Sequence, residues 1–294
     1  MDKKIIRTKI TGGLPMRTLS AFNKFTNTLK EQDLIMPVLF IGHGSPMNGI
    51  EDNEFSQRWT KMAKEMPVPA AVLVISAHWF TKGTLITAME FPKTIHDFGG
   101  FPKALYDVKY PAPGNPALAK ETAALIHTAH VIPDHDWGLD HGTWTVVRHM
   151  YPDANIPVLQ LSIDYTKPPQ HHFNLAKELY SLRKKGVLII GSGNMIHNLG
   201  MVAWDKINGP AYGYDWTLQL NEKFKQLILS SDYNQLINYD RLGKEGKLAI
   251  PTPEHYLPLL YTLGLKGSSD NPGIFNDKAV AGSLTMTSVK LCPA

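Results

Sequence analysis

Twelve histidines are spread along the 294-residue chain. Three of them come after short apolar runs: His43 after residues 37–41, His78 after 70–76 and His197 shortly after 186–190. His43 also lies between two glycines, which let a backbone turn sharply and approach a bound ion or ligand closely. Because imidazole binds divalent metals and exchanges protons near neutral pH, we predict an active site built on these residues. The alternative is a backbone contact for His43 and packing against Trp79 for His78.

Three further histidines are candidates because of their neighbours. Thr252 is expected to cap a helix with Pro253 at its first position, so that His255 projects from the first turn beside Glu254. His96 and His141 lie in segments that mix polar and aromatic residues, a mixture typical of ligand pockets. His135, in a polar loop with Asp134 and Asp136, is a weaker candidate. The remaining histidines are interpreted as structural or surface residues: His127, His130, His149, His171 and His172.

The composition narrows the choice of metal ligands and partners. Cys292 is the single cysteine, so a disulfide framework within the chain and a thiolate metal cage are excluded. The net charge of +4 is not gathered into a basic stripe, which argues against a nucleic acid partner. No apolar run reaches the roughly 18 residues of a membrane span, and no secretory signal is visible. We therefore expect a cytoplasmic protein without a membrane partner.

The histidines are embedded in a pattern of strands and helices. We predict strands over residues 37–41, 70–76, 157–163 and 186–190, and helices over 53–66, 116–129, 173–184 and 214–230. Alternating strands and helices indicate an α/β fold with a mostly parallel or mixed central sheet, covered by helices on both faces. Ligands of such sheets collect beyond the carboxyl ends of the strands, where His43, His78 and His197 are expected.

We predict a single catalytic domain over residues 36–294, preceded by an N-terminal extension over 1–35. Leu19, Phe22, Phe25 and Leu29 give this extension the spacing of a weakly amphipathic helix, and a leader without regular structure is the alternative.

Six motifs, in this order, resemble the DOPA-dioxygenase type of class III extradiol ring-cleaving dioxygenases. They are Gly42-His43-Gly44-Ser45-Pro46, Ser76-Ala77-His78-Trp79, His96-Asp97-Phe98-Gly99-Gly100-Phe101-Pro102, Asp140-His141-Gly142, Gly191-Ser192-Gly193-Asn194-Met195-Ile196-His197-Asn198 and Thr252-Pro253-Glu254-His255. The resemblance runs from about residue 36 to the C-terminus.

The resemblance implies a role for each matching histidine. His43, His78 and His255 would hold one divalent metal ion per chain, either Fe(II) for ring cleavage or Zn(II) as bound. His197 would be the acid/base group, with a place as a further metal ligand as the alternative. His141 would lie near the substrate hydroxyls, and His96 is predicted to bind substrate. Protocatechuate-cleaving relatives use a glutamate as third ligand, so Glu254 competes with His255, which the DOPA-type subgroup favours.

The implied reaction inserts both atoms of O2 into a catechol such as L-DOPA, by 4,5-cleavage, to give a muconic semialdehyde. Its partners would be the catechol and O2, and the chain would be a monomer or a small homo-oligomer. Two alternatives stay open at this point: a zinc-dependent hydrolase on the same scaffold, and a catalytically inactive relative that only binds metal or ligand.

Overall fold

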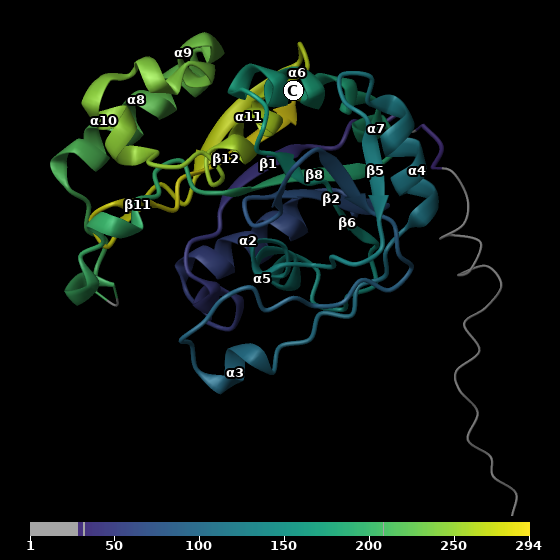
Figure 1. Cartoon of the computed structure of the whole chain (residues 1–294), viewed down its shortest axis with the longest axis horizontal. Helices are drawn as coiled ribbons and strands as arrows, with labels where there is room; N and C mark the ends of the chain where they lie inside the picture. Colours follow the sequence, from purple (N-terminus) through teal and green to yellow (C-terminus); the bar gives the residue numbers. More distant parts are fainter. Residues whose placement is uncertain (1–28, 32, 208) are drawn as a thin grey trace, which may run out of the picture.

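The structure is a computed structural model, and it describes residues 29–31, 33–207 and 209–294 (Figure 1). The helix pattern of the N-terminal extension, from Leu19 to Leu29, falls outside these residues except for its last position.

A six-stranded sheet forms the centre of the domain. In spatial order, its strands are β6 Val158–Gln160, β2 Ala71–Ser76, β8 Val187–Gly193, β1 Val38–Gly42, β12 Ser288–Pro293 and β9 Asp270–Phe275. The first four run parallel, whereas β12 is antiparallel to both β1 and β9. The mixed sheet and the α/β class are as predicted. Because β8 separates β1 from β2, the carboxyl ends of all three strands meet at one edge of the sheet.

Helices cover both faces of the sheet, which explains why its strands are apolar on both sides. Leu39 and Ile41 in β1 point into a core shared with α2 (Glu54–Glu65) and α5 (His141–Met150). Val38 and Phe40 point the opposite way, into a core shared with α6 (Pro169–Glu178) and α11 (Leu257–Gly264). Figure 1 shows α2 and α5 below the sheet and α6 and α11 above it.

The remaining elements lie around this layered core. The helices are α3 Lys103–Tyr106, α4 Pro116–Leu125, α7 Tyr180–Lys184, α8 Asp215–Leu229, α9 Tyr233–Ile237 and α10 Gly243–Ala249, and the 3₁₀ turns are η1 Pro46–Gly49, η2 Leu199–Met201, η3 Trp204–Lys206 and η4 Tyr239–Arg241. Three strand pairs complete the fold: β3 Phe80–Thr81 with β7 Ile163–Asp164, β4 Thr84–Thr87 with β5 Val131–Asp134, and β10 Ala279–Val280 with β11 Leu284–Thr285. Within the described ranges, no helix is long and apolar enough to cross a membrane.

Three predicted elements differ from those observed. The helix predicted over residues 116–129 ends at Leu125, because the N–H groups of His127 and Thr128 donate to the Glu178 carboxylate instead of continuing the helix. The helix predicted over 173–184 is two helices, α6 and α7, and α6 begins earlier with a proline in its first turn.

The strand predicted over 157–163 is also two elements. It leaves the central sheet after Gln160, because Ser162 bonds to Leu85 of β4 through both its backbone and its hydroxyl.

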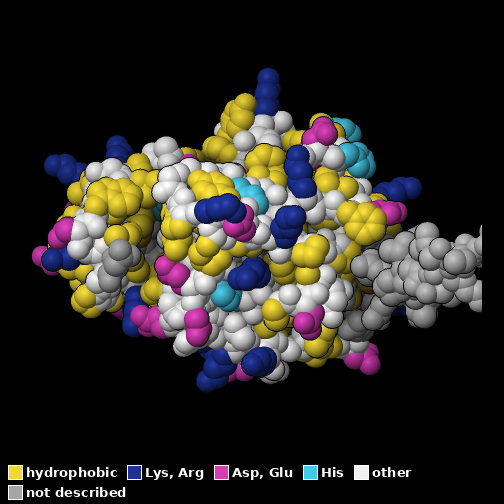
Figure 2. Space-filling view, turned by 90° about the horizontal axis from the view of Figure 1, so that it is seen from below, with side chains coloured by type: hydrophobic (Ala, Val, Ile, Leu, Met, Phe, Trp, Pro, Cys, Tyr) yellow, Lys and Arg dark blue, Asp and Glu magenta, His cyan; other side chains and the backbone are white. Residues whose placement is uncertain are grey.

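Charged side chains are dispersed on the face that Figure 2 displays. Lys and Arg side chains stand singly there among apolar and acidic ones, and histidine is visible between them. This face therefore has no continuous basic stripe of the kind that follows a nucleic acid backbone.

Candidate active site

The two histidines that follow β1 and β2 meet beyond the carboxyl end of β8. Their Nε2 atoms are 3.1 Å apart, and His43 is only 1% exposed. Gly44 has a φ of +63°, a conformation that glycine adopts easily, and it turns the chain directly after His43. Strand order and this turn together bring side chains from positions 35 residues apart into contact.

Hydrogen bonding fixes which nitrogen of His43 carries the proton. The Ser192 hydroxyl donates to the carbonyl oxygen of Gly142 at 2.6 Å, and it lies 3.0 Å from His43 Nδ1. A serine has one hydroxyl proton, so the hydroxyl must accept from His43 Nδ1–H. The Nε2 of His43 is therefore unprotonated and faces His78.

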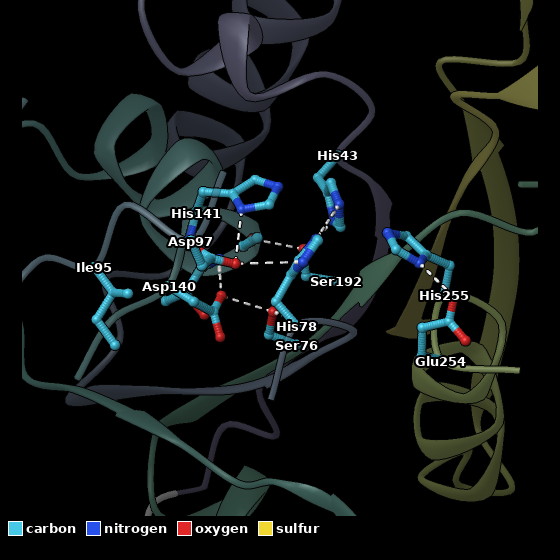
Figure 3. Close-up of polar contacts among 12 residues, drawn as sticks. His43, Ser76, His78, Ile95, Asp97, Asp140, His141, Ser192, Glu254 and His255 are labelled. Carbon is cyan, nitrogen blue, oxygen red and sulfur yellow. Dashed lines mark hydrogen bonds and ion pairs between the residues drawn. The ribbon is translucent and has the colours of Figure 1, made fainter. Parts of the chain in front are cut away.

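Asp97 contacts two histidines of the site (Figure 3). Its Oδ1 accepts from the backbone N–H of His141, and its Oδ2 lies 2.9 Å from His141 Nδ1 and 3.4 Å from His78 Nδ1. Burial alone acts to raise the pKa of Asp97, but the hydrogen bonds from His141 outweigh it and leave this pKa below its ordinary value. Asp97 is therefore an ionised acceptor between the two rings.

His255 approaches from the opposite side, and its position corrects one prediction. Helix α11 begins at Leu257, so Thr252 does not cap it and His255 precedes the helix. The Thr252 hydroxyl instead donates to Glu254 Oε1 at 2.7 Å, and the same oxygen lies 3.4 Å from His255 Nδ1. In Figure 3, Glu254 lies on the side of His255 that is away from His43, His78 and His141. The helix starts late because the carbonyl oxygen of His255 accepts a hydrogen bond from the N–H of Asn194. The neighbouring Gly193 leaves room for this contact, since a Cβ on it would lie 2.1 Å from the same carbonyl oxygen.

His197 lies against His255. The two rings are stacked with centroids 3.6 Å apart and an interplanar angle of 9°. The backbone N–H of His197 donates to Ala249, and the residue forms a β-bridge with Leu284, so its position depends on two distant segments. Burial, and then the nearby His255, lower the pKa of His197 to about 3, whereas Glu254 acts against this change.

Two groups of side chains have metal-binding geometry. The ligand atoms of His43, His78 and His141 all lie within 4.8 Å of one another, and the same holds for His197, Glu254 and His255. The groups are adjacent, because the His255 ring centroid is 5.0 Å from that of His78 and 5.4 Å from that of His43.

The chemistry of these donors fits a divalent cation. Burial first, and then neighbouring imidazoles, lower the pKa of both His43 and His78 well below the ordinary value, so both rings are neutral. An unprotonated Nδ1 of His78 would direct its lone pair at the ionised Asp97, so the proton of His78 belongs on Nδ1 as well. Two Nε2 lone pairs then face each other at 3.1 Å with no proton between them. A metal ion that accepts both lone pairs removes this repulsion.

His96, the predicted substrate-binding residue, is separated from the histidine cluster by the Phe98 ring. Its Nε2 contacts the carbonyl oxygen of Val108 at 3.0 Å, so this nitrogen is occupied. The Phe98 ring packs between His96 and His141, at centroid distances of 5.8 Å and 5.5 Å. The ring of Phe98, a residue that was not predicted to belong to the site, thus contacts His141.

A second buried network of hydrogen bonds supports the loop around His78. The sequence patterns did not predict it. Asp140 accepts hydrogen bonds from the Ser76 hydroxyl at 2.7 Å and from the Gln160 amide at 2.6 Å. Burial, and then the charge of Asp97, raise the pKa of Asp140 above its ordinary value. The position of Asp140 directly before His141 was the available signal, because an aspartate there caps helix α5.

The fold and the histidine cluster define a metal-dependent enzyme class, and comparison with known proteins identifies it. Residues 37–289 match the family described as the catalytic LigB subunit of aromatic ring-opening dioxygenase. The chain belongs to this family, and the resemblance to class III extradiol dioxygenases is confirmed.

Individual relatives agree with this assignment. The chain is 48% identical to the 4,5-DOPA dioxygenase extradiol of Escherichia coli (strain K12), over 87% of this chain and 94% of the relative. It is 34% identical to the 4,5-DOPA dioxygenase extradiol of Beta vulgaris, over 88% of this chain and 97% of the relative. The crystal structure of an uncharacterized Escherichia coli K12 protein superimposes with a TM-score of 0.74 at 43% identity, covering 87% of this chain and 99% of that one.

Proposed function

We propose that this aromatic ring-opening dioxygenase cleaves catechols such as L-DOPA at the 4,5-position, inserts both atoms of O2 and releases a muconic semialdehyde. The observation that carries the proposal is the 3.1 Å distance between the Nε2 atoms of His43 and His78, since Ser192 and Asp97 lie beside Nδ1 of these rings and favour the proton there. The names of the two relatives above support L-DOPA as the substrate to test first.

His43, His78 and His255 are the proposed ligands of one divalent ion. Each has its Nδ1 beside a protein oxygen, from Ser192, Asp97 and Glu254 respectively, which leaves Nε2 free. Glu254 orients His255 in this assignment and is not itself a ligand. When bound, the ion lowers the pKa of a catechol hydroxyl and activates O2, chemistry that suits Fe(II), with Zn(II) as the alternative bound ion.

His197 is the proposed acid/base group. A base must be neutral before it accepts a proton, and burial, which lowers the pKa of His197, keeps its ring neutral. The proton of the second catechol hydroxyl would move to this ring. Glu254, whose pKa is lowered to about 2 because hydrogen bonds from His255 and Thr252 outweigh burial, is the nearby negative charge that stabilises the resulting imidazolium.

His141 is the proposed contact for a substrate hydroxyl. With its Nδ1–H held by Asp97, its Nε2 is a hydrogen-bond acceptor toward the space beside His43 and His78. Phe98 supplies an apolar wall next to this ring, and His96 supports Phe98 from behind. We therefore assign His96 an indirect part in substrate binding.

Oxygen uptake tests the proposal. Anaerobically purified, Fe(II)-loaded protein is given L-DOPA and a panel of substituted catechols in an oxygen electrode, and the yellow semialdehyde is followed by absorbance. We expect one O2 consumed per semialdehyde formed with at least one catechol, and no uptake by the Zn(II)-loaded protein. Lack of uptake with every catechol, despite full metal occupancy, would instead favour the hydrolase.

The cellular setting is part of the proposal. A cytoplasmic location is supported by the single cysteine, which cannot form a disulfide within the chain. The substrate partners are the small catechol and O2, and the monomer or small homo-oligomer stays a prediction.

A further inference from the structure

Asp97 occupies a position that the ligand assignment does not explain. Its Oδ2 lies between Nδ1 of His141, at 2.9 Å, and Nδ1 of His78, at 3.4 Å (Figure 3). The two rings are themselves close, with centroids 3.8 Å apart. One carboxylate oxygen therefore faces both a proposed metal ligand and the proposed substrate contact.

A backbone group of α5 helps to hold this carboxylate in position. Its Oδ1 accepts the N–H of His141, which belongs to the first turn of α5. The Asp97 side chain is only 16% exposed. A half-buried acceptor with a partner at each oxygen constrains ring orientation more strongly than a mobile surface carboxylate does.

We propose that Asp97 is a positioning residue shared by two histidines: it keeps the Nδ1 protons of both His78 and His141 in place, so that both Nε2 atoms face the reaction space. This inference rests on the proposed roles of His78 and His141. It adds a coupling, because a single side chain then sets both the affinity for the metal and the orientation of the group that meets the substrate.

The reverse arrangement is disfavoured by simple electrostatics. An unprotonated Nδ1 on either ring would direct a lone pair at the ionised Asp97 oxygen. Replacing the carboxylate by an amide changes this pattern, since an amide NH2 facing Nδ1 donates to it and moves the ring proton to Nε2. In His141 that proton would point into the substrate space, and in His78 it would compete with the metal for Nε2 and so weaken metal binding.

Asp97→Asn is therefore the decisive variant, with Asp107→Asn as its matched control. Asp107 undergoes the same chemical change in the same region, but its side chain is 58% exposed and pairs with Lys103 at the surface. The first readout is Zn(II) affinity by competition with a chromophoric chelator. We expect Asp97→Asn to bind Zn(II) about 10- to 100-fold more weakly and Asp107→Asn to bind as the unmodified protein does.

The second readout is the tautomer itself. In ¹⁵N-histidine-labelled, Zn(II)-loaded protein, long-range proton–nitrogen correlation spectra should show His78 and His141 protonated at Nδ1. Asp97→Asn should move the His141 proton to Nε2. The spectrum of the unmodified protein decides the question even where a variant folds poorly, because an Nε2-protonated His141 in that protein would overturn the proposal.

The third readout distinguishes the effect of Asp97 on His141 from its effect on His78. Asp97→Asn is combined with His141→Ala, and kcat for catechol cleavage is measured at saturating Fe(II). We expect Asp97→Asn to lower kcat about tenfold or more alone and to have no further effect in the His141→Ala background, while it weakens Zn(II) binding equally in both. Unchanged Zn(II) affinity, or a kcat loss of equal size in both backgrounds, would refute the shared role. Since Zn(II) affinity and tautomer need no turnover, a failure of the proposed function would be recognised separately.

Discussion

At the scale of single residues, the site is determined by which imidazole nitrogens are already occupied. Ser192 accepts from Nδ1 of His43, Asp97 lies beside Nδ1 of His78 and His141, and Glu254 lies beside Nδ1 of His255. These contacts leave four Nε2 atoms for metal and substrate. His141 lies close enough to His43 and His78 to be a metal ligand itself, so substitutions are needed to distinguish the ligands from the substrate contact.

Two substitutions distinguish the third ligand from the substrate contact. His255→Ala should abolish tight Zn(II) binding, because two imidazoles alone hold the ion weakly, whereas His141→Ala should keep the metal and turn over catechol more slowly. Metal content after gel filtration, measured by elemental analysis, gives the answer. The opposite pattern, with metal lost only from His141→Ala, would make His141 the third ligand.

The acid/base assignment of His197 has its own test. His197→Gln should retain the metal and lower kcat by about a hundred- to ten-thousand-fold, the usual cost of losing one acid/base group. The exposed His130 provides the control, since His130→Gln should leave kcat unchanged. Loss of metal from His197→Gln would identify it as a ligand.

At the scale of helices and strands, sequence patterns located the site but not its internal contacts. His43 and His78 were predictable because each follows an apolar strand, and strands of a parallel sheet end at a common edge. The contact between Asp97 and His141 joins a loop to the first turn of α5 across 44 residues, and the contact between Ser192 and His43 spans 149. Neither strand nor helix periodicity reports on such pairs, since they depend on how loops fold back over the sheet.

Helix boundaries failed for a related reason. Tertiary hydrogen bonds ended α4 at Leu125 and delayed α11 to Leu257, although local propensity allowed longer helices. The bounds of two helices were predicted to within one residue: α2 (Glu54–Glu65), which Asn53 caps, and α8 (Asp215–Leu229), which has no side-chain cap.

The packing of α6 on α11 predicts a pH dependence of stability. His172 in α6 is fully buried with its Nδ1 3.0 Å from the Tyr261 hydroxyl, and burial lowers its pKa from 6.5 to about 4. Because the unfolded chain binds this proton first as the pH falls, the contribution is complete above pH 6.5 and is lost between pH 6.5 and 4. The shift corresponds to about 3 kcal/mol.

Urea unfolding at pH 7 and pH 4.5 measures this contribution. The free energy of unfolding of His172→Gln should fall less between the two pH values than that of the unmodified protein, and the exposed His130→Gln should behave like the unmodified protein. Equal pH dependence in all three would show that His172 does not contribute to acid destabilisation.

A buried ion pair connects α7 to β9 and should dominate the stability of that edge. Arg183 and Asp270 are both buried, with Nη2 2.8 Å from Oδ1, and Arg183 also donates to the carbonyl oxygens of Met36 and Leu265. Asp270→Asn leaves a buried guanidinium without its counter-charge and should reduce the free energy of unfolding by about 3–5 kcal/mol. The exposed pair partner Asp107 sets the baseline, because Asp107→Asn should cost less than about 1 kcal/mol in the same urea titration. Equal losses would mean that burial does not strengthen the pair.

At the scale of the whole molecule, one domain brings together six motifs that are spread over more than two hundred residues. The family match over residues 37–289 spans all six. The proposed metal ligands follow β1, follow β2 and precede α11, so the proposed site forms only when these strands and the helical layers beside them are in place. This explains why no single short motif in the sequence predicts the metal site.

The fate of the two oxygen atoms of O2 distinguishes ring opening by a dioxygenase from the alternatives. Fe(II)-loaded protein is reacted with L-DOPA, or with the best catechol of the panel, under ¹⁸O2, and the acyclic product is analysed by mass spectrometry after rapid quenching. Ring cleavage by a dioxygenase predicts that both labelled atoms appear in the ring-opened semialdehyde, apart from exchange of the aldehyde oxygen with water. A product with no label, or an intact ring, would show that the protein does not open the ring as a dioxygenase.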